Sequence, residues 1–239
     1  MTFITVNEGD VTSIRIDTGP GVPVSGQIVL EGDSASAAPS SFGLTANAAN
    51  ADTSPLAGAR TSRATINDDG TFQFDDLIGA NRFAAARAPT GWWLKSVTIN
   101  GINAAIDPVT FTRGDSALTN VTATFASGAG SIEGKVLDDR RQPTADFGVV
   151  VFSSDPERWF SQSPFLRFGS PSQDGTFSVT GLPPEEYLVA ALDRIDGGPD
   201  FGDWQNPTVL AALAPTARRV KVAAGQTVST ELRMLRAAR

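Results

Sequence analysis

The feature that most constrains the fold is a four-residue sequence, Asp-Gly-Thr-Phe, that occurs twice. It begins at Asp69 and again at Asp174, and each copy leads into an alternating polar and apolar stretch that ends on a leucine, Leu77 or Leu182. An Asp-Gly pair favours a tight turn, and strict alternation is typical of a strand with one buried face. The repeat therefore predicts two equivalent hairpins within two copies of one β domain.

Further landmarks recur in the same order. Residues 24–28 and residues 132–136 share a strand-like alternation, and Gly114 and Gly225 each precede a stretch rich in Ser, Thr and Val. The distance along the chain between matched landmarks is nearly constant, which indicates a tandem duplication. We therefore predict one β-sandwich in residues 22–127 and a second in residues 128–239.

A third copy of the closing stretch precedes both predicted domains. Residues 6–16 resemble residues 112–124 and 222–232, the predicted last strands of the two repeats. Residues 1–21 are therefore expected to be the closing strand of an upstream domain or a donor strand that pairs with another sheet, in cis or in trans. The apolar positions that such a strand would bury are Val11, Ile14 and Ile16.

Composition excludes several classes of function. The net charge is −7, whereas binding to nucleic acid needs a basic surface that releases counterions. The chain has no cysteine and no histidine, so it has no disulfide frame, no thiolate metal site and no Ser-His-Asp triad. We predict no cofactor, no metal and no catalytic residue. No apolar run reaches membrane-spanning length, and the first residues lack the basic and apolar regions of a signal peptide.

Three stretches of the second repeat together resemble a known family. They are Gly134-Lys-Val136, Asp174-Gly-Thr-Phe177 and Gly181-Leu-Pro-Pro-Glu-Glu-Tyr-Leu188. This pattern is similar to the carboxypeptidase regulatory-like domain, a transthyretin-like (prealbumin-like) β-sandwich, and the resemblance covers most of residues 22–239. Glu185 stands where the family commonly has glycine, and we expect this departure to alter only the turn.

The resemblance implies both a fold and a setting. The fold is all-β, with two tandem antiparallel seven-stranded Greek-key β-sandwiches, transthyretin-like or Ig-like, preceded by an extra N-terminal strand. The setting is an exported bacterial multidomain protein, placed outside the cell, on its surface or in the periplasm. The implied partners are neighbouring β-sandwich domains or protein subunits.

Aromatic residues are the candidates for a ligand or partner surface. They are Trp159, Phe160, Phe165 and Trp204, which lie in predicted loops and would stack on sugars or form a local hydrophobic plug. Aromatic residues in loops more often form a local hydrophobic plug than a surface that stacks on a ligand. Trp92 and Trp93 are adjacent in a predicted strand, so they must point to opposite faces, one buried and the other at least partly exposed.

The sequence offers candidate residues for a calcium site and for an isopeptide cross-link, but both sets have simpler interpretations. Asp68, Asp69 and Asp174 would need more converging oxygens to hold calcium, so we interpret them as turn residues. A Lys–Asn isopeptide cross-link, as in related adhesin sandwiches, needs a lysine that points into the core. Lys135 and Lys221 alternate with apolar residues and are predicted to face solvent.

Paired carboxylates are the remaining route to catalysis, as in glycoside hydrolysis. The acids available for it lie in a Gly- and Pro-rich loop where solvated acids are common, namely Asp193, Asp196, Asp200 and Asp203. The sequence therefore favours a non-catalytic spacer, adhesion or assembly module. The alternative is an accessory module that binds carbohydrate or peptide, with polysaccharide as the partner.

Overall fold

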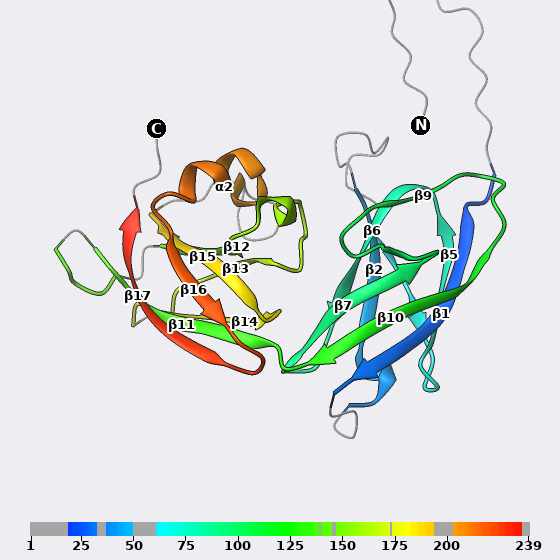
Figure 1. The fold of residues 1–239 in the computed structure, drawn as a ribbon, viewed down its shortest axis with the longest axis horizontal. Helices are drawn as coiled ribbons and strands as arrows, with labels where there is room; N and C mark the ends of the chain where they lie inside the picture. The colour runs from blue at the N-terminus through cyan, green and yellow to red at the C-terminus, as the bar shows by residue number, and fades with distance from the viewer. Residues whose placement is uncertain are drawn as a thin grey trace, which may run out of the picture.

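The computed structural model describes residues 19–32, 37–49, 61–138, 140–144, 147–172, 174–193 and 203–235. These residues form two strand-rich units side by side (Figure 1). The predicted donor segment with Val11, Ile14 and Ile16 lies outside the described residues, as do Asp196 and Asp200.

The first unit is a sandwich of two sheets. Its strands are β1 (Val22–Glu31), β2 (Gly43–Ala48), β3 (Thr61–Arg63), β4 (Thr65–Ile66), β5 (Thr71–Leu77), β6 (Gly79–Arg87), β7 (Trp92–Ile99), β8 (Ile102–Asn103), β9 (Val109–Phe111) and β10 (Leu118–Ser127). One sheet has the order β4-β5-β1-β10-β7-β8, and the other has the order β3-β2-β6-β9. Their facing sides enclose an aromatic core that includes Phe42, Phe72, Phe74, Phe83 and Phe125.

The described residues of the second unit form seven strands and one α-helix. They are β11 (Gly130–Leu137), β12 (Gly148–Ser153), β13 (Leu166–Gly169), β14 (Thr176–Leu182), β15 (Glu185–Leu192), α2 (Pro207–Leu213), β16 (Arg218–Val222) and β17 (Thr227–Leu235). The strand order is β13-β12-β15-β17-β11-β14, and β16 pairs with residues 185–189 of β15, on the same edge as β17. β15 and β17 share only two registered residue pairs, at the ends of both strands.

The two units share their main strand pairings. β1 pairs antiparallel with β5 and parallel with β10, and β11 pairs antiparallel with β14 and parallel with β17. The set β3-β2-β6-β9 corresponds in the same way to β13-β12-β15-β16. The first unit adds β7 and β8 where the second unit has α2. This confirms the predicted all-β class with two tandem β-sandwiches.

The parallel pair of first and last strands is a feature that the sequence pattern does not reveal. Apolar residues alternate in the same way in parallel and antiparallel strands, so alternation specifies a buried face and no direction. β10 ends at Ser127 and β11 begins at Gly130, on either side of the boundary expected from the repeat.

Burial on both faces explains why residues 149–152 of β12 are all apolar. Val149 and Val151 of β12 contact the core between the two layers, whereas Val150 and Phe152 contact a second cluster beneath α2. The helix fits the sequence locally, because Asn206 caps it through the Thr208 amide at 2.9 Å and Pro207 occupies its first turn. No helix in the described parts of the chain is long and apolar enough to cross a membrane.

Candidate functional site

The predicted aromatic set is divided between separate packing environments. Trp204 and Phe165 are 6% and 8% exposed, and they belong to different core clusters of the second unit. Trp159 is half-buried and meets Phe152 edge to face, with 5.5 Å between ring centroids. Phe160 is also half-buried and contacts the first unit. The four side chains therefore do not lie together on one exposed surface.

Three of these aromatics lie on the segment between β12 and β13, residues 154–165, which we call the interface loop. Its first turn is a short 3-10 helix, Pro156–Arg158, capped by the Asp155 side chain through the Glu157 amide at 3.1 Å. The Trp159 indole N–H donates to the Ser153 carbonyl at 2.8 Å, which returns the chain toward β12. Local hydrogen bonds thus give this loop a defined shape.

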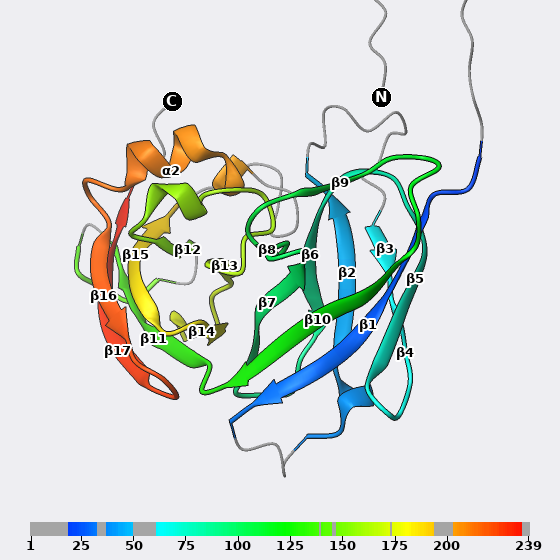
Figure 2. The same cartoon turned by 45° about the vertical axis from the view of Figure 1, so that its right-hand side comes forward.

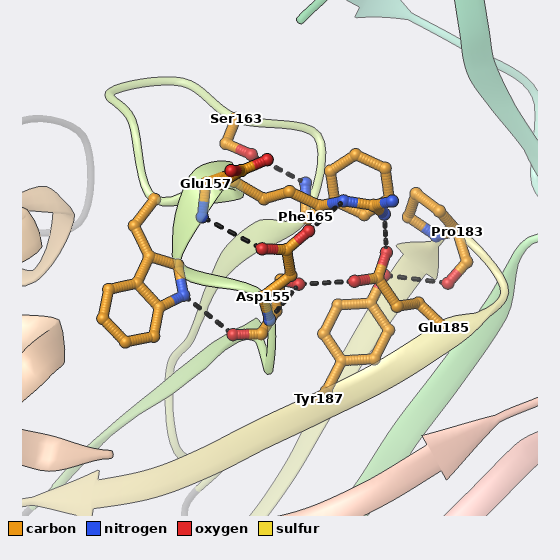
Figure 3. Close-up of polar contacts among 10 residues, drawn as sticks. Asp155, Glu157, Ser163, Phe165, Pro183, Glu185 and Tyr187 are labelled. Carbon is orange, nitrogen blue, oxygen red and sulfur yellow. Dashed lines mark hydrogen bonds and ion pairs between the residues drawn. The ribbon is translucent and has the colours of Figure 1, made fainter.

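A charged network anchors the interface loop to the start of β15 (Figure 3). Glu185 accepts hydrogen bonds from the Ser153 hydroxyl and from Nη1 of Arg158, one on each carboxylate oxygen. Arg158 also lies 3.4 Å from Asp155, and its guanidinium carbon lies 4.2 Å from the centroid of the Phe165 ring. The expectation that Glu185 alters only the turn is therefore wrong, because its side chain ties two separate segments together.

Burial sets the ionisation of this network. Desolvation raises the pKa of Glu185, and the Ser153 hydrogen bond and the Arg158 charge oppose that rise only in part. A raised pKa means that the stability Glu185 contributes is present below its ordinary pKa and is lost as the pH rises through the folded-state pKa. Burial also raises the pKa of Tyr187, whose hydroxyl donates to the Pro183 carbonyl at 2.8 Å (Figure 3).

The tip of the interface loop packs on the first unit. The guanidinium carbon of Arg82, on β6, lies 4.4 Å from the centroid of the Phe160 ring, which is cation–π geometry. Arg82 Nε also donates to the Ile106 carbonyl at 2.9 Å, and the Ile106 side chain packs against the core of the second unit. Burial lowers the pKa of Arg82. Sequence patterns do not reveal this contact, because its partners come from different repeats.

The covalent junction between the units is short and hydrogen-bonded. β10 and β11 are separated by Gly128 and Ala129 and follow one another along the base of both units (Figure 1). The Ala129 amide donates to the Gly91 carbonyl at 2.9 Å, and the Gly128 carbonyl accepts from Gly225 at 2.7 Å. In the turned view of Figure 2, β7 and β14 face each other across this junction, where they are in contact.

The two Asp-Gly turns have the same hydrogen bonds. Oδ1 of Asp69 accepts from the amide and hydroxyl of Thr71 at 2.9 and 2.6 Å, and Asp174 accepts likewise from Thr176 at 3.2 and 2.6 Å. These bonds lower the pKa of both carboxyl groups, with the threonine hydroxyl as the main cause. No group of three or more acidic side chains that could hold a metal occurs among the residues the structure describes.

Other predicted orientations are confirmed. Lys135 and Lys221 are exposed, as is Lys95, which pairs with Glu31 at 2.7 Å. Trp92 is 6% exposed and packs in the first core, whereas its neighbour Trp93 is half-buried on the opposite face of β7. Of the loop acids, Asp193 follows the end of β15 and is exposed.

Comparison with known proteins finds likeness only among solved structures. No family model matches the sequence, and no curated protein sequence matches it. A streptococcal ancillary pilin is similar over 89% of this chain and 68% of its own, at 12% identity and a TM-score of 0.30. The shaft pilin SpaA of Lactobacillus rhamnosus GG is similar over 88% of this chain and 96% of its own, at 10% identity and a TM-score of 0.28.

Two further structures extend this set. A B repeat unit of the collagen-binding surface protein of Staphylococcus aureus is similar over 75% of this chain and 94% of its own, at 13% identity and a TM-score of 0.28. The Bacillus anthracis TIE protein is similar over 89% of this chain, at 11% identity and a TM-score of 0.29, and the chain spans only 33% of its length. With such low scores, the role of this chain has to be argued from its own geometry.

Proposed function

We propose that the chain is a non-catalytic structural module that carries tension between neighbouring domains of an exported bacterial protein, on the cell surface or in the periplasm. The observation that supports this proposal is the parallel pairing of the first and last strand in each unit. β1 and β10 share seven registered pairs, and β11 and β17 also share seven. The resemblance of the sequence to carboxypeptidase regulatory-like domains agrees with an accessory role.

Parallel pairing of terminal strands determines how a unit responds to a pull on its two ends. Because both strands run in the same direction, the chain enters β1 at one end of the pair and leaves β10 at the other. Tension between those points slides one strand along its partner and loads the interstrand hydrogen bonds together. An antiparallel terminal pair would place both points at the same end and open one bond at a time.

The same geometry continues into the second unit. Only Gly128 and Ala129 separate β10 from β11, so a pull transmitted along β10 reaches β11 directly. β11 then shares the load with β17, which leads to the end of the described chain. Residues 22–127 and residues 130–235 are equal in length, so both units should lengthen by the same amount when they unfold.

Single-molecule force spectroscopy tests the proposal. We expect the intact chain, pulled from its two ends, to unfold in two steps that lengthen it equally. Each step should add roughly 30–35 nm, as the reach of an extended chain of that size predicts. Gly134→Ala should lower the force of one step only, because a Cβ at this position would lie 1.7 Å from the Thr230 carbonyl oxygen and would push β11 away from β17. Gly19→Ala is the control, since its Cβ meets nothing within 4 Å.

Two outcomes would contradict a tension-carrying role. One is that the intact chain unfolds without resolved steps. The other is that Gly134→Ala leaves both forces unchanged although its lower thermal stability shows that the substitution disturbs the second unit.

A further inference from the structure

A cleft of about 570 Å³ lies between the two units. The first unit contributes the β6–β7 hairpin, whose outer face carries small residues such as Ala84 and Ala86. The second unit contributes the end of the interface loop, β13 and the segment that carries Trp204. Junctions between domains are common places for ligand sites, and this volume is in the usual range for a small organic molecule.

The charged side chains that line the cleft have one sign. Arg87 and Arg167 line it, and no carboxylate does so among the described residues. Arg87 already donates to the carbonyls of Ser40 and Ser41. Arg167 donates through Nη1 to the Ser163 and Leu166 carbonyls at 3.3 and 3.0 Å, and no described carboxylate lies within ion-pair distance of it.

The guanidinium of Arg167 would be stabilised by a negatively charged partner in the cleft. Arg167 is half-buried, and this burial lowers its pKa because desolvation disfavours the charge. A partly desolvated guanidinium whose only acceptors are neutral carbonyls is stabilised when an anion joins it. The guanidinium also has further N–H groups in a planar arrangement that suits a carboxylate.

The indole of Trp93 gives an independent sign of a missing acceptor. Trp93 lines the cleft, and its Nε1–H is buried without any hydrogen-bond partner. Buried indole N–H groups usually find an acceptor, because leaving one unpaired is destabilising. A ligand oxygen in the cleft would supply that acceptor once the Trp93 ring turns its N–H toward the cleft, since the described residues around the indole do not.

From this arrangement we propose that the cleft binds a small organic carboxylate, with its carboxylate on Arg167 and an oxygen within reach of the Trp93 N–H. The apolar part of the lining, including Pro89, Pro164 and Leu166, would contact the carbon skeleton, which favours an organic anion over an inorganic one. The proposal does not depend on the tension-carrying role, because none of the residues that line the cleft belongs to β1, β10, β11 or β17.

Tryptophan fluorescence reports binding in the cleft directly. Three of the four tryptophans line it, namely Trp92, Trp93 and Trp204, whereas Trp159 does not. The full chain would be titrated with benzoate and with D-glucuronate, which separate an aromatic acid from a sugar acid. Benzamide and D-glucose are the neutral counterparts, and inorganic phosphate tests charge alone. We expect a saturable change with at least one of the two carboxylates and none with the three controls.

Two variants locate the site. Arg167→Gln should weaken binding of the active carboxylate at least about tenfold, the usual effect of losing one charged hydrogen-bond partner. Trp93→Phe keeps an aromatic ring without the N–H and should weaken binding about three- to tenfold, which preserves the test if Arg167→Gln does not fold. Arg218→Gln, at an exposed position on β16 outside the cleft, should bind like the native chain.

The proposal is overturned if neither carboxylate gives a saturable signal, or if phosphate or a neutral counterpart binds as well as the carboxylate does. It is equally overturned if a folded Arg167→Gln or Trp93→Phe variant keeps native affinity.

Discussion

Gly26 and Gly134 occupy equivalent positions in the first strand of each unit, opposite Val121 and Thr230 of the last strand. A Cβ at Gly26 would lie 1.9 Å from the Val121 carbonyl oxygen, and one at Gly134 would lie 1.7 Å from that of Thr230. Glycine at this position therefore permits the close approach of the parallel strand in both repeats.

The residues opposite these glycines differ in one polar atom. Val121 is 3% exposed in the first core, whereas the Thr230 hydroxyl is buried without a hydrogen-bond partner. A buried hydroxyl that lacks a partner destabilises the fold, and valine has nearly the same shape without it.

Thr230→Val should therefore raise the free energy of unfolding of the second unit by about 1 kcal/mol. The reciprocal change, Val121→Thr, should lower that of the first unit by about 1–3 kcal/mol, because it buries a hydroxyl at the equivalent position. Urea unfolding of both variants beside the native chain measures the effect. A Thr230→Val variant less stable than the native chain would show that the hydroxyl is satisfied in solution.

Single-residue predictions succeeded where the strand pattern alone determines orientation. The exposure of Lys135 and Lys221 and the opposite faces of Trp92 and Trp93 follow directly from alternation. The expectation that Glu185 alters only the turn fails because its partners, Ser153 and Arg158, come from a distant segment. Sequence spacing carries no information about such a contact.

Among the structural elements, the Asp-Gly hairpins show how local chemistry is repeated. In each turn the glycine has a positive φ, +83° at Gly70 and +75° at Gly175, and the preceding aspartate accepts from the threonine that begins the next strand. The pKa of both aspartates is lowered from an ordinary value of 3.8. Their ionised form is therefore favoured by the folded state.

This shift has a definite sign in the dependence of stability on pH. A lowered folded-state pKa means that the unfolded chain binds more protons, so the contribution is complete above the ordinary value and is lost as the pH falls through the folded-state pKa. The double variant Asp69→Asn, Asp174→Asn should lose less stability than the native chain between about pH 5 and about pH 2. Urea midpoints across that range measure it, and equal losses in both chains would contradict the assignment.

Other elements were predictable to differing degrees. The helix α2 has local signals in the sequence, namely an Ala- and Leu-rich stretch and flanking prolines. The apolar run of β12 is typical of a buried strand, yet its second covered face depends on α2 and the interface loop. The parallel pairing of terminal strands depends on connections through the whole unit and could not be read from any segment.

For the whole molecule, duplication accounts for the two folds but not for how they are joined. The Arg82–Phe160 contact, the Ile106 packing and the two-residue link between β10 and β11 all lie at the junction. The first unit contributes Arg82 and Ile106, and the second contributes the interface loop, a division of roles that the repeat itself does not suggest. A fixed junction is what both the proposed path of tension and the proposed ligand cleft require.

Backbone ¹⁵N relaxation tests this central claim most directly, because it measures the rotational correlation time of each unit within the intact chain. We predict one common value for amides of both units, that of a single particle of the whole chain's size. Arg82→Ala should shorten it and let the values of the two units diverge, whereas Arg63→Ala, at an exposed position on β3, should not. Two distinct, shorter correlation times in the native chain would show that the units move independently and would contradict the account.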